Sequence, residues 1–125
     1  METKTFLSKA LSSEGYYCVF ASRSGDGKIA QKFYDSIDAV IDASHNYDKE
    51  GYDVYYGLAT FDKAGSRKVD NVNRLKSFFL DLDCGPSKEF FSQEQAIQAL
   101  RNFCKRNKLP KPTMINSGRG IHVYW

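Results

Sequence analysis

Apolar and polar residues follow two different periods along the chain, and these periods predict both helices and strands. Three helices are expected, and the first covers residues 3–12. The second begins at a cap formed by Asp35 or Ser36 and ends at Gly51. The third begins at a capping box formed by Ser92 and Gln95 and ends before Pro110. Strands are expected at 16–22, 28–34, 52–61, 76–83, 112–116 and 121–125, with turns at 24–28, 62–66 and 117–120. Hairpins combined with helices in this order predict an α+β fold with an antiparallel or mixed sheet and flanking helices.

The length of 125 residues predicts a single domain, 1–125. We divide it into an N-terminal part, 1–51, and a second part, 52–125, which carries the motifs described below. No apolar run approaches the roughly 20 residues that a membrane span requires. The first residues also lack the basic leader and apolar core of a signal peptide. We therefore expect a cytoplasmic protein without a membrane partner.

The cysteine pattern predicts free thiols. The chain has three cysteines, an odd number, and no two of them have the C-x-x-C spacing. This argues against a disulfide framework and against a zinc knuckle. We interpret Cys18, Cys84 and Cys104 as thiols of a reducing compartment.

Charge is distributed unevenly, although the net charge is only +3. Residues 1–62 carry six basic and ten acidic side chains, a net charge of −4, whereas residues 63–125 carry twelve basic and five acidic ones, a net charge of +7. An anionic partner is therefore expected to bind the second half. A basic surface that is merely solvated is the alternative.

The stretch SFFLDLDCG ends a predicted apolar strand with two acids. Because side chains alternate along a strand, Phe79, Asp81 and Asp83 point to the same face. Two carboxylates held this close repel one another, and a divalent cation would compensate their charge. A solvated strand end without function is the alternative interpretation.

The second candidate feature is the turn SGRG at 117–120 and the strand that follows it. Alternation places His122 and Tyr124 on one face of that strand. A glycine-rich turn is expected to offer free backbone N–H groups, and Arg119 adds a fixed positive charge. These groups suit a polyphosphate, although such a turn is more often only a hairpin connection and a lone histidine is more often structural.

Together, FFLDLD and INSGRGIHVYW resemble the catalytic core of the archaeo-eukaryotic primase superfamily, in particular the primase-polymerase domains of phages and plasmids. Asp81 and Asp83 match the first motif of that family, an apolar strand that ends in D-x-D. Gly120-Ile121-His122 matches the second motif, a small residue two positions before a histidine. The resemblance covers residues 52–125 well, including a basic lead-in at 65–77, and the N-terminal part loosely.

The resemblance implies an RRM-like catalytic core and a DNA-directed nucleotidyltransferase that acts in replication. Such an enzyme makes primers on a single-stranded DNA template from nucleoside triphosphates, and a helicase domain can follow it in the parent protein. The resemblance assigns Asp81 and Asp83 to the binding of Mg²⁺ or Mn²⁺. It assigns His122, Ser117, Gly118 and Arg119 to the nucleotide. The residues that it assigns to DNA are Arg67, Lys68, Arg74 and Lys76.

One departure from the family pattern concerns the metal site. The family completes its metal site with a third acid downstream of the histidine strand, and nothing follows Trp125 in this sequence. We therefore expect a fragment of a longer protein that is inactive by itself. Two alternatives stay open: a non-catalytic nucleotide- or DNA-binding module, and a D-x-D phosphohydrolase.

Overall fold

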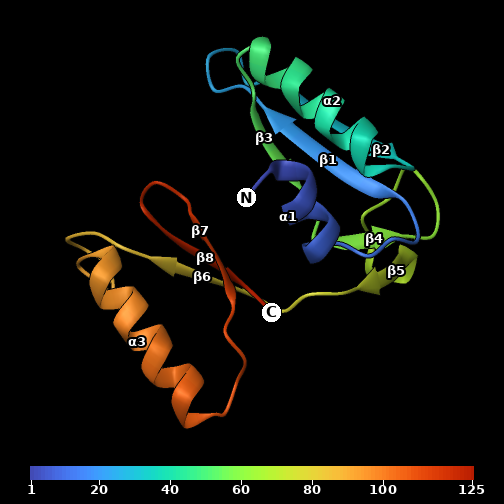
Figure 1. Ribbon diagram of the computed structural model, residues 1–125. Coiled ribbons are helices and arrows are strands. Elements are labelled where there is room, and N and C mark those ends of the chain that lie inside the picture. The colour runs from blue at the N-terminus through green and yellow to red at the C-terminus, as the bar shows by residue number, and fades with distance from the viewer. The chain divides into compact units, whose positions relative to one another are not determined.

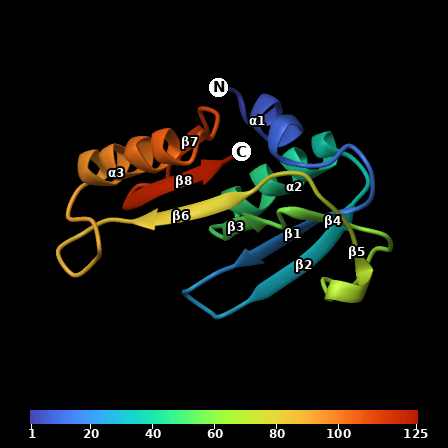
Figure 2. The ribbon, with the colours of Figure 1, turned by 90° about the horizontal axis from the view of Figure 1, so that it is seen from below.

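The computed structural model describes all residues, 1–125, and confirms the α+β class. The elements follow in the order α1 (Thr3–Ala10), β1 (Tyr17–Ser22), β2 (Ile29–Tyr34), α2 (Ile37–Lys49), β3 (Asp53–Tyr56), β4 (Ala59–Phe61), the 3₁₀ helix η1 (Val69–Asn71), β5 (Val72–Leu75), β6 (Phe79–Asp83), α3 (Gln93–Arg106), β7 (Thr113–Asn116) and β8 (Gly120–Tyr124). All strand pairs are antiparallel and form three separate sheets. The chain divides into two compact units, Met1–Lys76 and Ser77–Trp125, whose elements Figures 1 and 2 show.

The first unit contains a three-stranded sheet in the order β2-β1-β3 and a two-stranded sheet of β4 and β5. The single strand predicted at 52–61 is wrong, because Gly57 and Leu58 separate β3 from β4. Strand β3 pairs with β1, whereas β4 pairs with β5. These pairings keep residues 52–76 with the N-terminal part, and the two compact units divide after Lys76.

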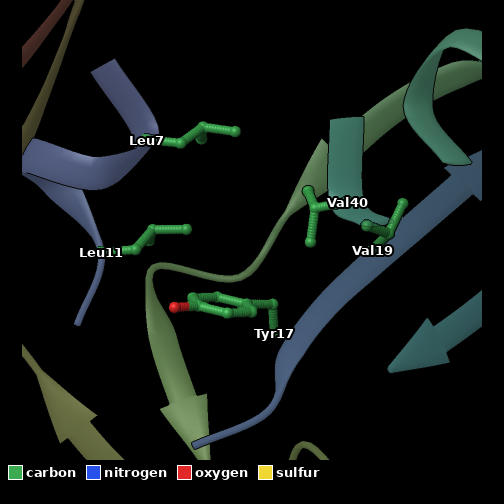
Figure 3. Packing of buried hydrophobic residues seen from close by; sticks show 5 residues of the cluster. All are labelled: Leu7, Leu11, Tyr17, Val19 and Val40. Carbon is green, nitrogen blue, oxygen red and sulfur yellow. The ribbon is translucent and has the colours of Figure 1, made fainter. Parts of the chain in front are cut away.

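Helices α1 and α2 bury one face of the β2-β1-β3 sheet. Figure 3 shows the core between them, which consists of Leu7, Leu11, Tyr17, Val19 and Val40. The hydroxyl of Tyr17 donates a hydrogen bond of 2.8 Å to the carbonyl oxygen of Ser12, so its polar end is satisfied inside the core. Burial also raises the pKa of Tyr17. Since alternate residues of a strand face opposite ways, the residues between Tyr17, Val19 and Ala21 on β1 face away from these helices.

Helix α2 begins and ends as the sequence predicts. The side-chain oxygen of Ser36 accepts a hydrogen bond from the Ala39 backbone N–H at 3.2 Å, which caps the first turn. Gly51, with φ of 81°, follows the last residues of the helix and adopts the left-handed conformation that favours glycine. Ser36 rather than Asp35 is therefore the cap.

The second unit is a three-stranded sheet in the order β6-β8-β7 with α3 on one face, as Figure 2 shows. Both β6 and β7 are antiparallel to β8, so they run parallel to each other and α3 connects them. This is the β-α-β arrangement that the sequence predicts, with β8 inserted between its two strands. The buried core consists of Leu100, Ile121 and Val123, with Leu82, Ile97, Cys104 and Trp125 packed around them.

Ser92 caps α3, as predicted, by accepting a hydrogen bond from the Gln95 N–H at 3.3 Å. The side chain of Gln95 accepts from the N–H of Phe91 at 3.0 Å, one residue earlier than a capping box requires. All three cysteines are free. None of the three helices has the length and apolar character needed to cross a membrane.

Candidate functional site

Strand pairing brings the two sequence motifs together on one face of the second unit. Asp81 on β6 lies opposite His122 on β8, and Asp83 lies opposite Gly120. Directly paired residues share a face of a sheet, so Asp81, Asp83 and His122 point to the same side. Helix α3 packs on the other side, where Leu82 meets it. Alternation predicts a shared face for Asp81 and Asp83, and the pairing of β6 with β8 adds His122 to it.

Asp81 and His122 form the centre of the candidate site. The Nε2 atom of His122 lies 3.7 Å from Oδ1 of Asp81, and the side chains are 36% and 50% exposed. The ring of Phe79 contacts the imidazole edge to face, with 5.5 Å between ring centroids. A carboxylate and an imidazole are therefore held side by side and remain accessible to a ligand.

A lysine that the sequence analysis did not assign contacts Asp83. The Nζ atom of Lys88 lies 3.1 Å from Asp83 Oδ2, and both side chains are about half exposed or more, at 49% and 61%. Lys88 follows in the turn after β6, where its N–H donates to the carbonyl oxygen of Gly85. This cation offsets part of the repulsion that we ascribed to the two acids alone. Lys88 lies five residues after Asp83, and the contact depends on the path of the turn after β6, so nothing in the sequence pairs the two.

The SGRG turn uses its backbone N–H groups internally. The N–H of Gly118 donates to Asn116 Oδ1 at 2.8 Å, and the N–H of Gly120 donates to Ser117 Oγ at 3.1 Å. The N–H of Ser117 donates to the carbonyl oxygen of Gly120, also at 3.1 Å. The expectation that these N–H groups are free for a polyphosphate is therefore wrong. The exposed side chain of Arg119 is the charged group that the turn offers to an anion.

Gln93, the first residue of α3, fixes the turn from the helix side. Its Nε2 atom lies 3.0 Å from Asn116 Oδ1 and 3.2 Å from the carbonyl oxygen of Gly120, and donates to both. The sequence analysis assigned neither Gln93 nor Asn116. Asn116 could have been found as an Asx residue directly before a Ser-Gly turn, whereas nothing in the sequence pairs it with Gln93.

Gly120 has a steric reason to be glycine. A Cβ atom at this position would overlap the carbonyl oxygen of Leu82 on the neighbouring strand. The two backbones therefore approach so closely that no side chain fits between them. This approach explains the small residue two positions before His122 in the second motif.

The four basic residues assigned to DNA lie in the first unit, whereas the D-x-D and histidine residues lie in the second. Two of them are engaged locally: Arg74 Nε lies 3.0 Å from Glu14 Oε2, and Lys76 Nζ donates to the carbonyl oxygen of Ser8 at 2.9 Å. The guanidinium of Arg67 lies over the ring of Phe20. Arg67 and Lys68 are exposed and have no acidic partner.

The donor set fits a divalent ion that is held jointly with a ligand. No group of three or more His, Cys, Asp or Glu side chains is arranged to hold a metal ion. Mg²⁺, however, is commonly bound through one or two carboxylates together with water and substrate phosphates. Asp81 and Asp83 supply oxygen donors of this kind on one exposed face.

Comparison of the chain with protein-family models, with curated proteins and with solved structures finds no match. The function is therefore inferred from the residues of the site and their geometry.

Proposed function

We propose that residues 1–125 carry the metal- and nucleotide-binding face of a primase-polymerase-type nucleotidyltransferase, which makes primers on single-stranded DNA. The observation that supports this proposal is the pairing of Asp81 with His122, at 3.7 Å, with Asp83 on the same face. Residues of both motifs, far apart in the sequence, thus meet on one accessible surface. The β-α-β-β order of the second unit supports the RRM-like core in this proposal.

In this proposal Asp81 and Asp83 are the ligands of Mg²⁺ or Mn²⁺. The bound metal supplies activation of a primer 3′-hydroxyl and stabilisation of the leaving pyrophosphate. His122 and the exposed Arg119 donate hydrogen bonds to the nucleotide phosphates, while Ser117 and Gly118 hold Arg119 in the turn.

Lys88 has a second role in the proposal. Its Nζ atom lies 3.1 Å from Oδ2 of Asp83 and forms an ion pair with this carboxylate. A metal ion that binds this carboxylate competes with Lys88 for it, because both are cations. The released ammonium group is then available to a phosphate oxygen of the nucleotide. Lys88 thus neutralises Asp83 before the metal binds.

Synthesis requires a third carboxylate beside Asp81 and Asp83, and residues 1–125 form no group of three or more His, Cys, Asp or Glu side chains that could hold a metal ion. This observation, together with the ion pair between Lys88 and Asp83, favours a second candidate function: a module that binds nucleotides or DNA without chemistry of its own. The two candidates differ in their need for metal. A module that binds through Lys88 and Arg119 retains a nucleoside triphosphate without a divalent ion.

The test is the fluorescence anisotropy of a labelled nucleoside triphosphate, measured with Mn²⁺ and with EDTA. The proposal predicts binding that requires Mn²⁺ and that falls at least about tenfold, or about 1.4 kcal/mol, when Asp81→Asn and Asp83→Asn are combined. Glu89→Gln is the matched control, because Glu89 is an exposed acid in the turn after β6. Equal affinity in the double variant would refute the proposal, and undiminished binding in EDTA would favour the module.

A further inference from the structure

The first unit carries two neighbouring aromatic side chains, the half-buried Phe20 and the exposed Tyr55, on the face of the β2-β1-β3 sheet that is opposite α1 and α2. Phe20 on β1 lies between Gln31 on β2 and Tyr55 on β3 in the strand register. The ring centroids of Phe20 and Tyr55 are 6.1 Å apart, and the angle between the ring planes is 49°. Tyr55 is 54% exposed. Large aromatic rings exposed on a sheet present flat surfaces on which other rings can stack.

Two basic residues border these aromatic rings. The guanidinium carbon of Arg67 lies 5.3 Å from the centroid of the Phe20 ring. Arg67, Lys68, Gln31 and Gly57 line one hollow of about 700 Å³. Neither Arg67 nor Lys68 forms an ion pair with an acidic side chain. Their charge is therefore available to an anion.

The loop that carries these basic residues is held in place. The side-chain amide of Asn71 donates to the carbonyl oxygens of Ser66 at 2.7 Å and Lys63 at 2.8 Å, and it accepts from the Lys63 N–H. Ser66 Oγ accepts from the N–H of Lys68 at 3.2 Å. Because these bonds fix the loop before any ligand arrives, binding loses less conformational entropy.

The helix-covered side of this unit carries more acids than the aromatic side, where the loop of Arg67 and Lys68 also holds Asp62 and Asp70. Helix α2, which covers the opposite face, carries Asp38, Asp42 and Asp48. On the aromatic face the strands carry one acid, Asp53, which lies opposite Ser22 and two residues before Tyr55 on β3. The basic loop and the aromatic rings therefore form a surface that favours a negatively charged ligand with flat rings.

We propose that this surface binds single-stranded DNA, with a base stacked on the exposed ring of Tyr55 beside Phe20 and backbone phosphates bound by Arg67 and Lys68. Stacking on aromatic side chains tolerates any base, and basic side chains follow the phosphates. Duplex DNA is excluded because its bases are already stacked on each other. That the bound strand is a DNA template rests on the proposed function. Binding of the strand to this surface requires no metal.

The test uses residues 1–125 and the anisotropy of fluorescein-labelled oligo-dT in EDTA. Tyr55→Ala is expected to weaken binding at least about fivefold, whereas Tyr55→Phe retains the ring and the affinity. Arg67→Ala is expected to weaken binding and to reduce its dependence on salt, because one phosphate contact is lost. The matched controls are Phe91→Ala, another exposed aromatic side chain at 68%, and Lys9→Ala; both are expected to bind like the unmodified chain.

Three results would overturn the proposal: equal affinity in the Tyr55→Ala variant, equal affinity for duplex DNA, or tighter binding of oligo-rU than of oligo-dT. Circular dichroism checks that each variant is folded, and Arg67→Glu, in an exposed loop, replaces Tyr55→Ala if that variant unfolds. The variant with Asp81→Asn and Asp83→Asn is expected to keep its DNA affinity. Failure of the metal site and failure of this surface therefore give different results.

Discussion

His122 on β8 lies directly opposite Asp81 on β6, with 3.7 Å between Nε2 and Oδ1. The imidazole is held against the ring of Phe79, on the same strand as Asp81. Neither side chain is buried, so this contact contributes little to stability. In the proposed function this contact brings a carboxylate oxygen for the metal and an imidazole nitrogen for the phosphates to one place.

The close approach of β6 and β8 predicts different effects for the two glycines of the turn at 117–120, Gly118 and Gly120. Gly120→Ala is expected to lower the free energy of unfolding by about 3 kcal/mol or more, because its Cβ overlaps the Leu82 carbonyl oxygen. Gly118→Ala is expected to lower it by about 1 kcal/mol, since Gly118 has φ of 93° but open space around it. Urea unfolding followed by the fluorescence of Trp125, the single tryptophan, measures both. Equal losses would contradict the steric argument.

The side chain of Gln93 is expected to position the turn at 117–120, which the proposed function assigns to the nucleotide. Gln93→Ala removes the hydrogen bonds to Asn116 Oδ1 and the Gly120 carbonyl, and should lower the free energy of unfolding by about 1 kcal/mol. It should also weaken metal-dependent nucleotide binding, although no charge is lost. Gln98→Ala is the matched control, because Gln98, on the same helix, donates only to Asn102. A nucleotide affinity equal to that of the control would show that the turn needs no support from α3.

Two buried hydroxyl groups in the first unit predict opposite effects on stability. Thr60 is fully buried and its Oγ1 has no hydrogen-bond partner, so Thr60→Val should leave stability unchanged or raise it by up to about 1 kcal/mol. Tyr17→Phe removes the hydrogen bond to Ser12 and leaves that carbonyl without a partner, which should cost about 1 kcal/mol. Thermal unfolding followed by circular dichroism compares them. A destabilised Thr60→Val variant would indicate a partner for that hydroxyl.

Single residues show which parts of the fold and of the site the sequence patterns predict. Alternation correctly assigned the face of each residue within its own strand, because period-2 geometry is local. That Asp81 and His122 share one face depends on the pairing of β6 with β8, which are separated in sequence by α3 and β7. The break at Gly57 was missed, since the residues on both sides of it are strand formers. Lys88 and Gln93 were missed as well. Their contacts depend on the path of the chain after β6 and on the position of α3, which no local pattern specifies.

Residues 1–125 are expected to bind nucleotides without synthesising primers. Two carboxylates without a third leave a metal ion loosely held, and a misplacement of about 1 Å costs on the order of a hundredfold in rate. The measurement is incorporation of labelled nucleotides on single-stranded DNA with Mn²⁺. Robust synthesis that is lost in Asp83→Asn would show instead that these residues form a complete metal site.

The most direct measurement of the central claim is the broadening of NMR signals by substoichiometric Mn²⁺, which reports the position of a bound ion. We predict selective broadening of the backbone amides of β6 and of the His122 ring, and its loss when Asp81→Asn and Asp83→Asn are combined. The carboxylates of Asp42 and Asp48 on α2 are the internal control for non-specific binding. Unchanged broadening in the double variant, or strongest broadening on α2, would contradict a metal site at Asp81 and Asp83.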